Sequence, residues 1–205
     1  MRFVFNKNGF INSIMFDIQK AIADLDSAAN LLNRTFGQSQ ARLDEIKVTI
    51  ADTIPVITRL GGNIGDVSKT MNEIAESTKR NYVATTKEAE KLYAASSLMG
   101  KSVKEITNNF IDSGVQVGKI GDQIEQGFNY VRSVGANAKE IMGDVEKNIS
   151  KINQYNFEGG VLGLTRMATQ ASLLRFDMNE TFKLADKVMK PEGAIEMAAA
   201  FQRLG

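Results

Sequence analysis

The sequence predicts an all-α protein, and three observations lead to that fold class. Apolar residues recur every three or four positions through most of the 205 residues, which is the period of an amphipathic helix. The chain contains 2 Pro, so obligatory helix breaks are few. Glycines and short polar residues stand where these periodic stretches end and begin, as helix caps require. We therefore expect helices packed against helices, without a sheet.

The first helix is expected over residues 10 to 36, with Gly37 as a left-handed C-cap. The short apolar run before it, Phe3-Val4-Phe5, has no partner strand in the sequence and is interpreted as a frayed or docked terminus. The apolar stripe of this helix is formed by Ile11, Ile14, Ile18, Ile22, Leu25, Ala29, Leu32 and Phe36.

The second helix is expected from about residue 39 to residue 78, with a kink between residues 55 and 62. Pro55 removes a backbone donor, and Gly61-Gly62 weakens the helix by roughly 1 kcal/mol per glycine relative to Ala. An unbroken helix over residues 43 to 74 would be about 48 Å long at 1.5 Å per residue. Its apolar seam consists of Leu43, Ile46, Ile50, Ile57, Ile64, Val67, Met71 and Ile74.

This apolar seam predicts a long coiled-coil arm over residues 1 to 78. A stripe so narrow needs a second helix to cover it, and we expect a second copy of the chain to do so. The seam therefore predicts a homo-oligomer, held together by the eight residues just named.

After residue 78 the sequence changes to short helices with clear boundaries, which predicts a compact multi-helix domain over residues 79 to 205. Ser102, Asn137 and Asp177 are each followed three residues later by Glu, the pattern of a capping box. Gly100 and Gly135 fit C-caps, and Pro191 fits a first helical turn. Paired helices recur without a fixed period, and the domain is expected to be part of a longer chain. The expected helices span residues 86 to 99, 102 to 112, 117 to 134, 137 to 155, 158 to 174, 178 to 188 and 191 to 204.

The composition argues against several classes of function. With 0 His and 0 Cys, the chain has neither imidazole for acid–base chemistry nor thiolate for nucleophilic attack or zinc binding. The balance of 25 basic and 24 acidic residues gives no net field toward nucleic acid, and no specific nucleic-acid site is seen. No apolar run is long enough for a transmembrane segment. We expect no enzymatic activity, no cofactor and no metal.

Two motifs could suggest a ligand site, and both are better explained by structure. Gly100-Lys101-Ser102 resembles the end of a phosphate-binding loop, but Ala95 stands where that loop needs Gly and the preceding residues are helical. The glycine-dense run from Glu158 to Gly163 lacks the order of a dinucleotide-binding turn. We expect it to be a tight helix-to-helix turn, in which Gly163 lets a neighbouring helix approach closely.

The second half of the chain resembles tape measure proteins of tailed bacteriophages. The resemblance covers about residues 100 to 205 and is carried by Tyr155-Asn156-Phe157-Glu158-Gly159-Gly160-Val161-Leu162-Gly163-Leu164, Met167-Ala168, Asp177-Met178, Leu184-Ala185-Asp186-Lys187 and Pro191-Glu192-Gly193-Ala194-Ile195-Glu196-Met197-Ala198. Upstream, Phe110-Ile111-Asp112-Ser113-Gly114 and Val134-Gly135-Ala136-Asn137 extend it. These are packing and capping residues, and none forms a catalytic signature.

The resemblance implies a virion structural protein. Members of the family are long helical chains that occupy the tail tube, set tail length during assembly and leave when the genome is ejected. It implies contacts with the tail tube, the baseplate or other virion proteins, and a location in the virion tail after assembly in the host cytoplasm. At 205 residues the chain would be a fragment or ordered portion of such a protein. Two alternatives stay open: an internal ejected protein of a short-tailed phage, and a bacterial coiled-coil signalling or adaptor protein.

Overall fold

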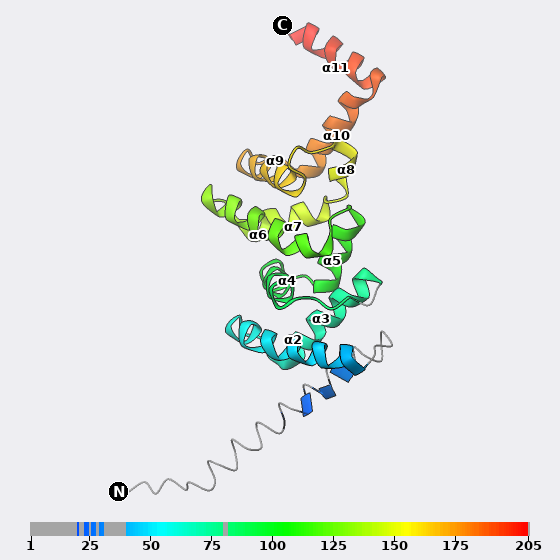
Figure 1. Ribbon diagram of the computed structural model, residues 1–205. Helices are drawn as coiled ribbons and strands as arrows, with labels where there is room; N and C mark the ends of the chain where they lie inside the picture. The colour runs from blue at the N-terminus through cyan, green and yellow to red at the C-terminus, as the bar shows by residue number, and fades with distance from the viewer. Residues whose placement is uncertain are drawn as a thin grey trace, which may run out of the picture. The chain divides into compact units, whose positions relative to one another are not determined.

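The computed structural model describes residues 20, 23–24, 26–27, 29–30, 40–79 and 82–204, and every regular element in these residues is a helix (Figure 1). The predicted all-α class is therefore confirmed for this part of the chain. Most of the expected first helix, and the run Phe3-Val4-Phe5, lie outside the described residues. The helices are α2 Gln40–Arg59, α3 Ile64–Thr78, α4 Thr86–Met99, α5 Val103–Asp112, α6 Val117–Ser133, α7 Ala138–Lys147, α8 Lys151–Tyr155, α9 Val161–Leu173, α10 Met178–Met189 and α11 Pro191–Leu204.

The chain divides into two compact units, and the division falls within the residues of α6. Unit 1 extends to Asp122 and unit 2 begins at Gln123. From the sequence we predict a different boundary, between residues 78 and 79, where the expected arm ends and the expected domain begins. In the structure the residues on both sides of that position belong to unit 1.

The expected long arm is a pair of shorter helices, α2 and α3, that pack against each other. The break falls inside the predicted kink region, because Gly61 adopts a left-handed conformation with φ of 89°. Asn63 then starts α3 with a full capping box, in which its side chain and that of Asp66 each accept a backbone amide. Pro55 lies inside α2 without ending it. A continuous rod of about 48 Å is therefore not formed, and the elongated coiled-coil arm is not confirmed.

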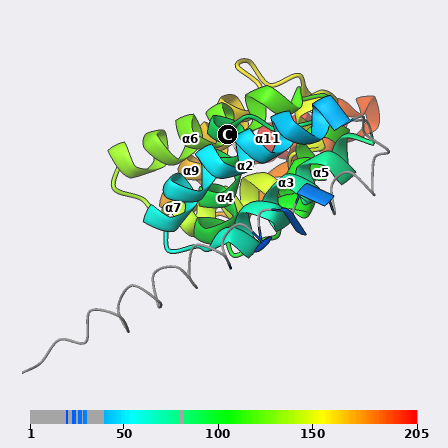
Figure 2. The same cartoon turned by 60° about the horizontal axis from the view of Figure 1, so that its bottom comes forward.

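Within unit 1, α2 and α3 form one helical hairpin and α4 and α5 form another. The two hairpins pack together, with α2 on α4 and α3 on α5 (Figures 1 and 2). The core contains residues from α2, α3 and α4 and from the helical residues near position 29. A salt bridge of 2.6 Å from Lys47 to Asp26 joins α2 to that preceding segment. The cluster comprises Ala29, Ile46, Ile50, Ile57, Val67, Met71 and Ala89, with Ile54, Val83 and Tyr93 packed against it.

Four helix pairs are joined by the same three-residue connection. Its first residue is left-handed, its third is an N-cap whose side chain accepts an amide, and the third residue after that cap is acidic. The connections recur at unequal spacings of roughly 35 to 40 residues, in the range of helical repeat proteins. The left-handed residues are Gly61, Gly100, Gly135 and Arg175, with φ of 89°, 70°, 73° and 58°. The N-caps are Asn63, Ser102, Asn137 and Asp177.

In unit 2, α7 packs on α9, and α10 packs on both α9 and α11. The single helix expected over residues 137 to 155 is instead two, because α7 ends at Lys147 with Asn148 as its C-cap and α8 begins at Lys151. α8 is fixed to α10 by aromatic packing, with the rings of Tyr155 and Phe182 stacked at 5.2 Å between centroids. The Tyr155 hydroxyl donates a short hydrogen bond to the Asp186 carboxylate.

Candidate interaction surface

The phosphate-loop-like tripeptide forms a helix-to-helix connection. Gly100 ends α4 in a left-handed conformation, and the Ser102 hydroxyl accepts the Glu105 amide at 3.1 Å to begin α5. The Lys101 ammonium forms an ion pair with the Glu105 carboxylate. Ala95 is buried in the middle of α4. The backbone geometry needed to surround a phosphate is therefore absent from this segment.

Ser102, Asn137 and Asp177 cap α5, α7 and α10, at the positions that the sequence predicts. The acids three residues later behave differently from the predicted capping boxes. Glu105 pairs with Lys101, and Glu140 accepts from the side-chain amide of Asn137 at 3.1 Å. Reciprocal boxes occur at two N-caps that the sequence analysis did not name, Asn63 and Thr85.

The glycine-dense segment is a tight turn, as expected, but the structure requires glycine at position 163 for a different reason than the one predicted. A Cβ on Gly163 would lie 2.2 Å from the carbonyl oxygen of Glu158, within the same turn. The close approach is thus of the loop onto its own helix and not of a neighbouring helix. Close helix packing is found instead at Gly121, where a Cβ would lie 2.6 Å from the Cβ of Lys91 on α4.

The apolar seam is covered by helices of its own chain. Its described side chains are at most 2% exposed, apart from Ile64, which is half-buried. Leu43 lies outside the residues whose side chains are described. The argument for self-association was that the seam could not be buried within one chain, and this structure removes that argument. The oligomeric state itself stays a prediction. The buried members are Ile46, Ile50, Ile57, Val67, Met71 and Ile74.

Unit 1 contains a small hollow of about 140 Å³ between the start of α4 and the start of α6. The Lys91 ammonium lies 2.5 Å from the Asp122 carboxylate at its edge, and this hydrogen bond lowers the pKa of Asp122. Gly118 and Gly121 line the hollow, and both are close to side chains of α4. The hollow is a packing gap with its charged groups paired, so it does not resemble a ligand site.

A wider groove of about 600 Å³ lies in unit 2, between α7 and the α9–α10 connection. Its wall carries both signs of charge, with Glu140 and Asp144 beside Lys147 and Arg175. Asp144 and Lys147 are 3.6 Å apart. Mixed charges that partly neutralise one another give no preference for an ionic ligand.

No group of three or more His, Cys, Asp or Glu side chains among the described residues could hold a metal ion. In the same part of the chain, no helix combines the length and hydrophobicity that membrane crossing demands.

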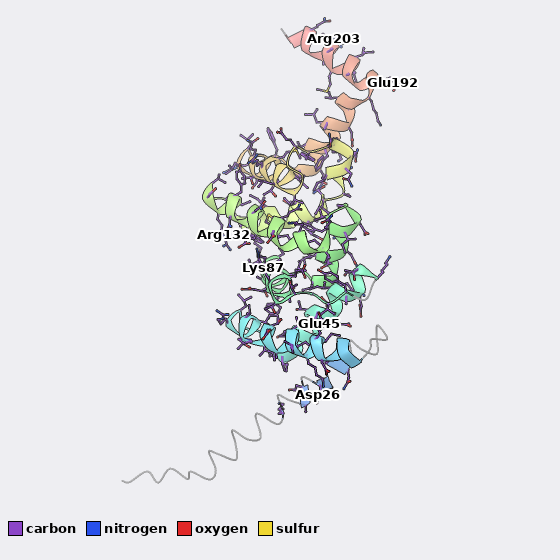
Figure 3. The ribbon with its side chains drawn as sticks, viewed as in Figure 1. Asp26, Glu45, Lys87, Arg132, Glu192 and Arg203 are labelled. Carbon is purple, nitrogen blue, oxygen red and sulfur yellow. The ribbon has the colours of Figure 1, made fainter. Side chains whose placement is uncertain are left out.

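The feature that sequence reasoning missed is a concentration of exposed apolar side chains in unit 2. Leu173, Leu174 and Phe176 surround the α9–α10 connection, and Leu184 and Val188 lie one helical turn apart on α10. α11, whose ends are marked by Glu192 and Arg203 in Figure 3, adds Ile195. The sequence shows these residues only as parts of helical stripes, so the signal for their exposure was not available from periodicity.

No family model matches the chain, and no curated protein or solved structure matches it significantly.

Proposed function

We propose that this chain is a virion structural protein, an ordered helical portion of the tape measure protein of a tailed bacteriophage. It would occupy the tail tube, help to set tail length and leave the tube at genome ejection. Its partners would be the tail tube, the baseplate, other virion proteins or further copies of itself, in the virion and, before that, in the host cytoplasm. The proposal starts from the sequence resemblance over residues 100 to 205.

The structural observation that favours this proposal is the fourfold recurrence of one capped helix connection. Helical repeats interact mainly with their neighbours, so units can be added or removed with little effect on distant ones. A protein whose length is its function needs that property. An interaction scaffold of another kind could also use it, so the experiment must measure length.

The repeat allows a clean deletion in the phage genome that encodes the chain. Removing residues 101 to 135 joins Gly100 to Ala136-Asn137, which restores a left-handed glycine, one residue and an N-cap. Electron microscopy should show tails that are uniformly shorter, by at most about 50 Å for 35 residues at 1.5 Å each. A duplication of the same residues should lengthen the tails by a similar amount.

Mass spectrometry of purified particles separates the alternatives. Peptides from this chain in particles whose tail length is unaffected by either genome change would favour an internal ejected protein. Peptides found in the host cell and absent from purified particles would favour a signalling or adaptor protein. Either result would overturn the tape measure proposal.

A further inference from the structure

α3 and α10 are equivalent helices, because each follows one of the four capped connections. In α3 the face that carries Thr70, Glu73, Ile74 and Ser77 lies against the start of α5. The Glu73 carboxylate accepts the backbone amide of Lys104 at 3.0 Å, and the Glu76 carboxylate lies 2.7 Å from the Lys104 ammonium. This face of α3 therefore receives α5, while α3 also packs against α2 and α4.

The same face of α10 carries Leu184 and Val188, which occupy the seventh and eleventh positions after the N-cap, as Thr70 and Ile74 do in α3. In α3 these two side chains are at most 2% exposed, whereas Leu184 is 53% and Val188 48% exposed. Leu184 and Val188 are thus apolar and about half exposed in the described part of the chain, at positions where α3 buries its side chains.

The charges that border this face are reversed between the two helices. In α3 the tenth and thirteenth positions after the N-cap are Glu73 and Glu76, which receive Lys104. In α10 the same positions are Lys187 and Lys190, and Lys183 precedes them by one turn. Lys187 lies 3.2 Å from Glu196 on α11, which neutralises part of this border, while Lys183 and Lys190 stay exposed.

We propose that this face of α10 docks an amphipathic helix whose apolar stripe is bordered by carboxylates. The partner would cover Leu184 and Val188, whose equivalents Thr70 and Ile74 are buried in unit 1. Its acids would meet the lysine border, which reverses the ion pair between Glu76 of α3 and Lys104 of α5. The inference is independent of the tape measure proposal, because it depends only on the equivalence of α3 and α10.

Two synthetic helical peptides of twenty residues test the proposal, with Leu at alternating three- and four-residue intervals and either Glu or Lys at all bordering positions. Fluorescence anisotropy with the full chain should show binding of the Glu peptide, weakened by salt, and about ten-fold weaker binding of the Lys peptide. Leu184→Asp with Val188→Asp should abolish binding of the Glu peptide. Val48→Asp is the matched control, because Val48 is an apolar residue on α2 in unit 1 that is 61% exposed.

The border is tested by Lys183→Glu with Lys190→Glu, which should exchange the preference so that the Lys peptide binds more tightly. Circular dichroism of each variant should match the parent chain, because all five changed side chains are exposed. Equal affinity for both peptides, binding that survives Leu184→Asp with Val188→Asp, or no binding of either peptide would each overturn the proposal.

Discussion

α3 in unit 1 and α10 in unit 2 begin with the same local signals and differ in what covers them. Each follows a left-handed residue, begins at a side-chain N-cap and has an acid in its first turn. α3 buries Ile74 completely, whereas α10 leaves Val188 at the equivalent position 48% exposed. Equivalent helix starts therefore do not imply equivalent burial, since burial depends on which helix the chain places alongside.

The left-handed residue that precedes the helix also differs between α3 and α10. Gly61 precedes α3, while Arg175 precedes α10 and has a φ of 58°, which residues other than glycine rarely adopt. In unit 2 the strained connection is flanked by exposed Leu174 and Phe176. In unit 2 the left-handed Arg175 and exposed apolar side chains thus occur together at one helix connection, whereas the connection before α3 uses glycine.

The largest expected difference is between Ile74→Asp and Val188→Asp. Ile74→Asp places a carboxylate in the core, and it should lower the free energy of unfolding of unit 1 by roughly 4 kcal/mol or more. Val188→Asp should change that of unit 2 by about 0.5 kcal/mol or less. Urea denaturation measures the loss, and hydrogen exchange with mass spectrometry assigns it to residues before or after Asp122. Similar losses from the two changes would mean that Val188 is covered in solution.

The N-caps of α5 and α10 should differ in strength. Ser102 accepts one amide at 3.1 Å, whereas Asp177 accepts two, at 2.7 Å and 3.3 Å, and adds a negative charge at the helix start. Ser102→Ala should cost about 1 kcal/mol and Asp177→Ala somewhat more, within the usual range of roughly 0.5 to 2 kcal/mol. Thermal unfolding measures both losses.

Lys101→Ala is the control for the α5 cap, because Lys101 lies beside Ser102 and its ammonium forms a surface ion pair with Glu105. It should cost at most about 0.5 kcal/mol. Calorimetry should detect no Mg-ATP binding by the parent chain or by this variant. Micromolar binding that Lys101→Ala abolishes would contradict the structural interpretation of the tripeptide.

The left-handed positions of two helix connections can be tested by adding a glycine at one and removing it at the other. Arg175→Gly should stabilise the chain by roughly 0.5 to 1 kcal/mol, because glycine adopts positive φ without a steric penalty. Gly135→Ala should destabilise it by about 1 kcal/mol. A Cβ at Gly135 would have no neighbour within 4 Å, so the backbone conformation alone sets this loss. A stabilising effect of Gly135→Ala, measured by urea denaturation, would contradict the assigned conformation.

The smallest effect concerns the contact of α8 with α10 at high pH. The hydrogen bond to Asp186, followed by partial burial, raises the pKa of Tyr155 to about 12, above the ordinary value of 10.0. The neutral phenol is thus favoured in the folded chain, so its stabilising contribution is complete below pH 10 and is lost as the pH rises toward 12. Comparing the stability of Tyr155→Phe with that of the parent chain between pH 9 and 12 isolates this contribution. A difference that is constant over this range would contradict the raised pKa.

Sequence alone determined the features that depend on neighbouring residues. Periodicity gave the helices, and the bounds of α4 and α11 agree with the expected ranges residue for residue. Gly100 and Gly135 adopt the left-handed conformations expected of them, and Ser102, Asn137 and Asp177 stand at helix starts. These features follow from steric limits on φ and from hydrogen bonds that span at most a few residues, so they can be predicted without knowledge of the fold.

Only the tertiary structure decided which apolar stripes are covered, and by what. The seam that included Ile50 and Val67 required a partner helix, and the reversal at Gly61 supplied one from the same chain. The stripe of α10 has the same periodicity, yet Leu184 and Val188 stay exposed. A helical period specifies that a face is apolar, but the partner is set by contacts between residues far apart in sequence. Periodicity therefore could not distinguish a covered seam in α3 from an open docking face on α10.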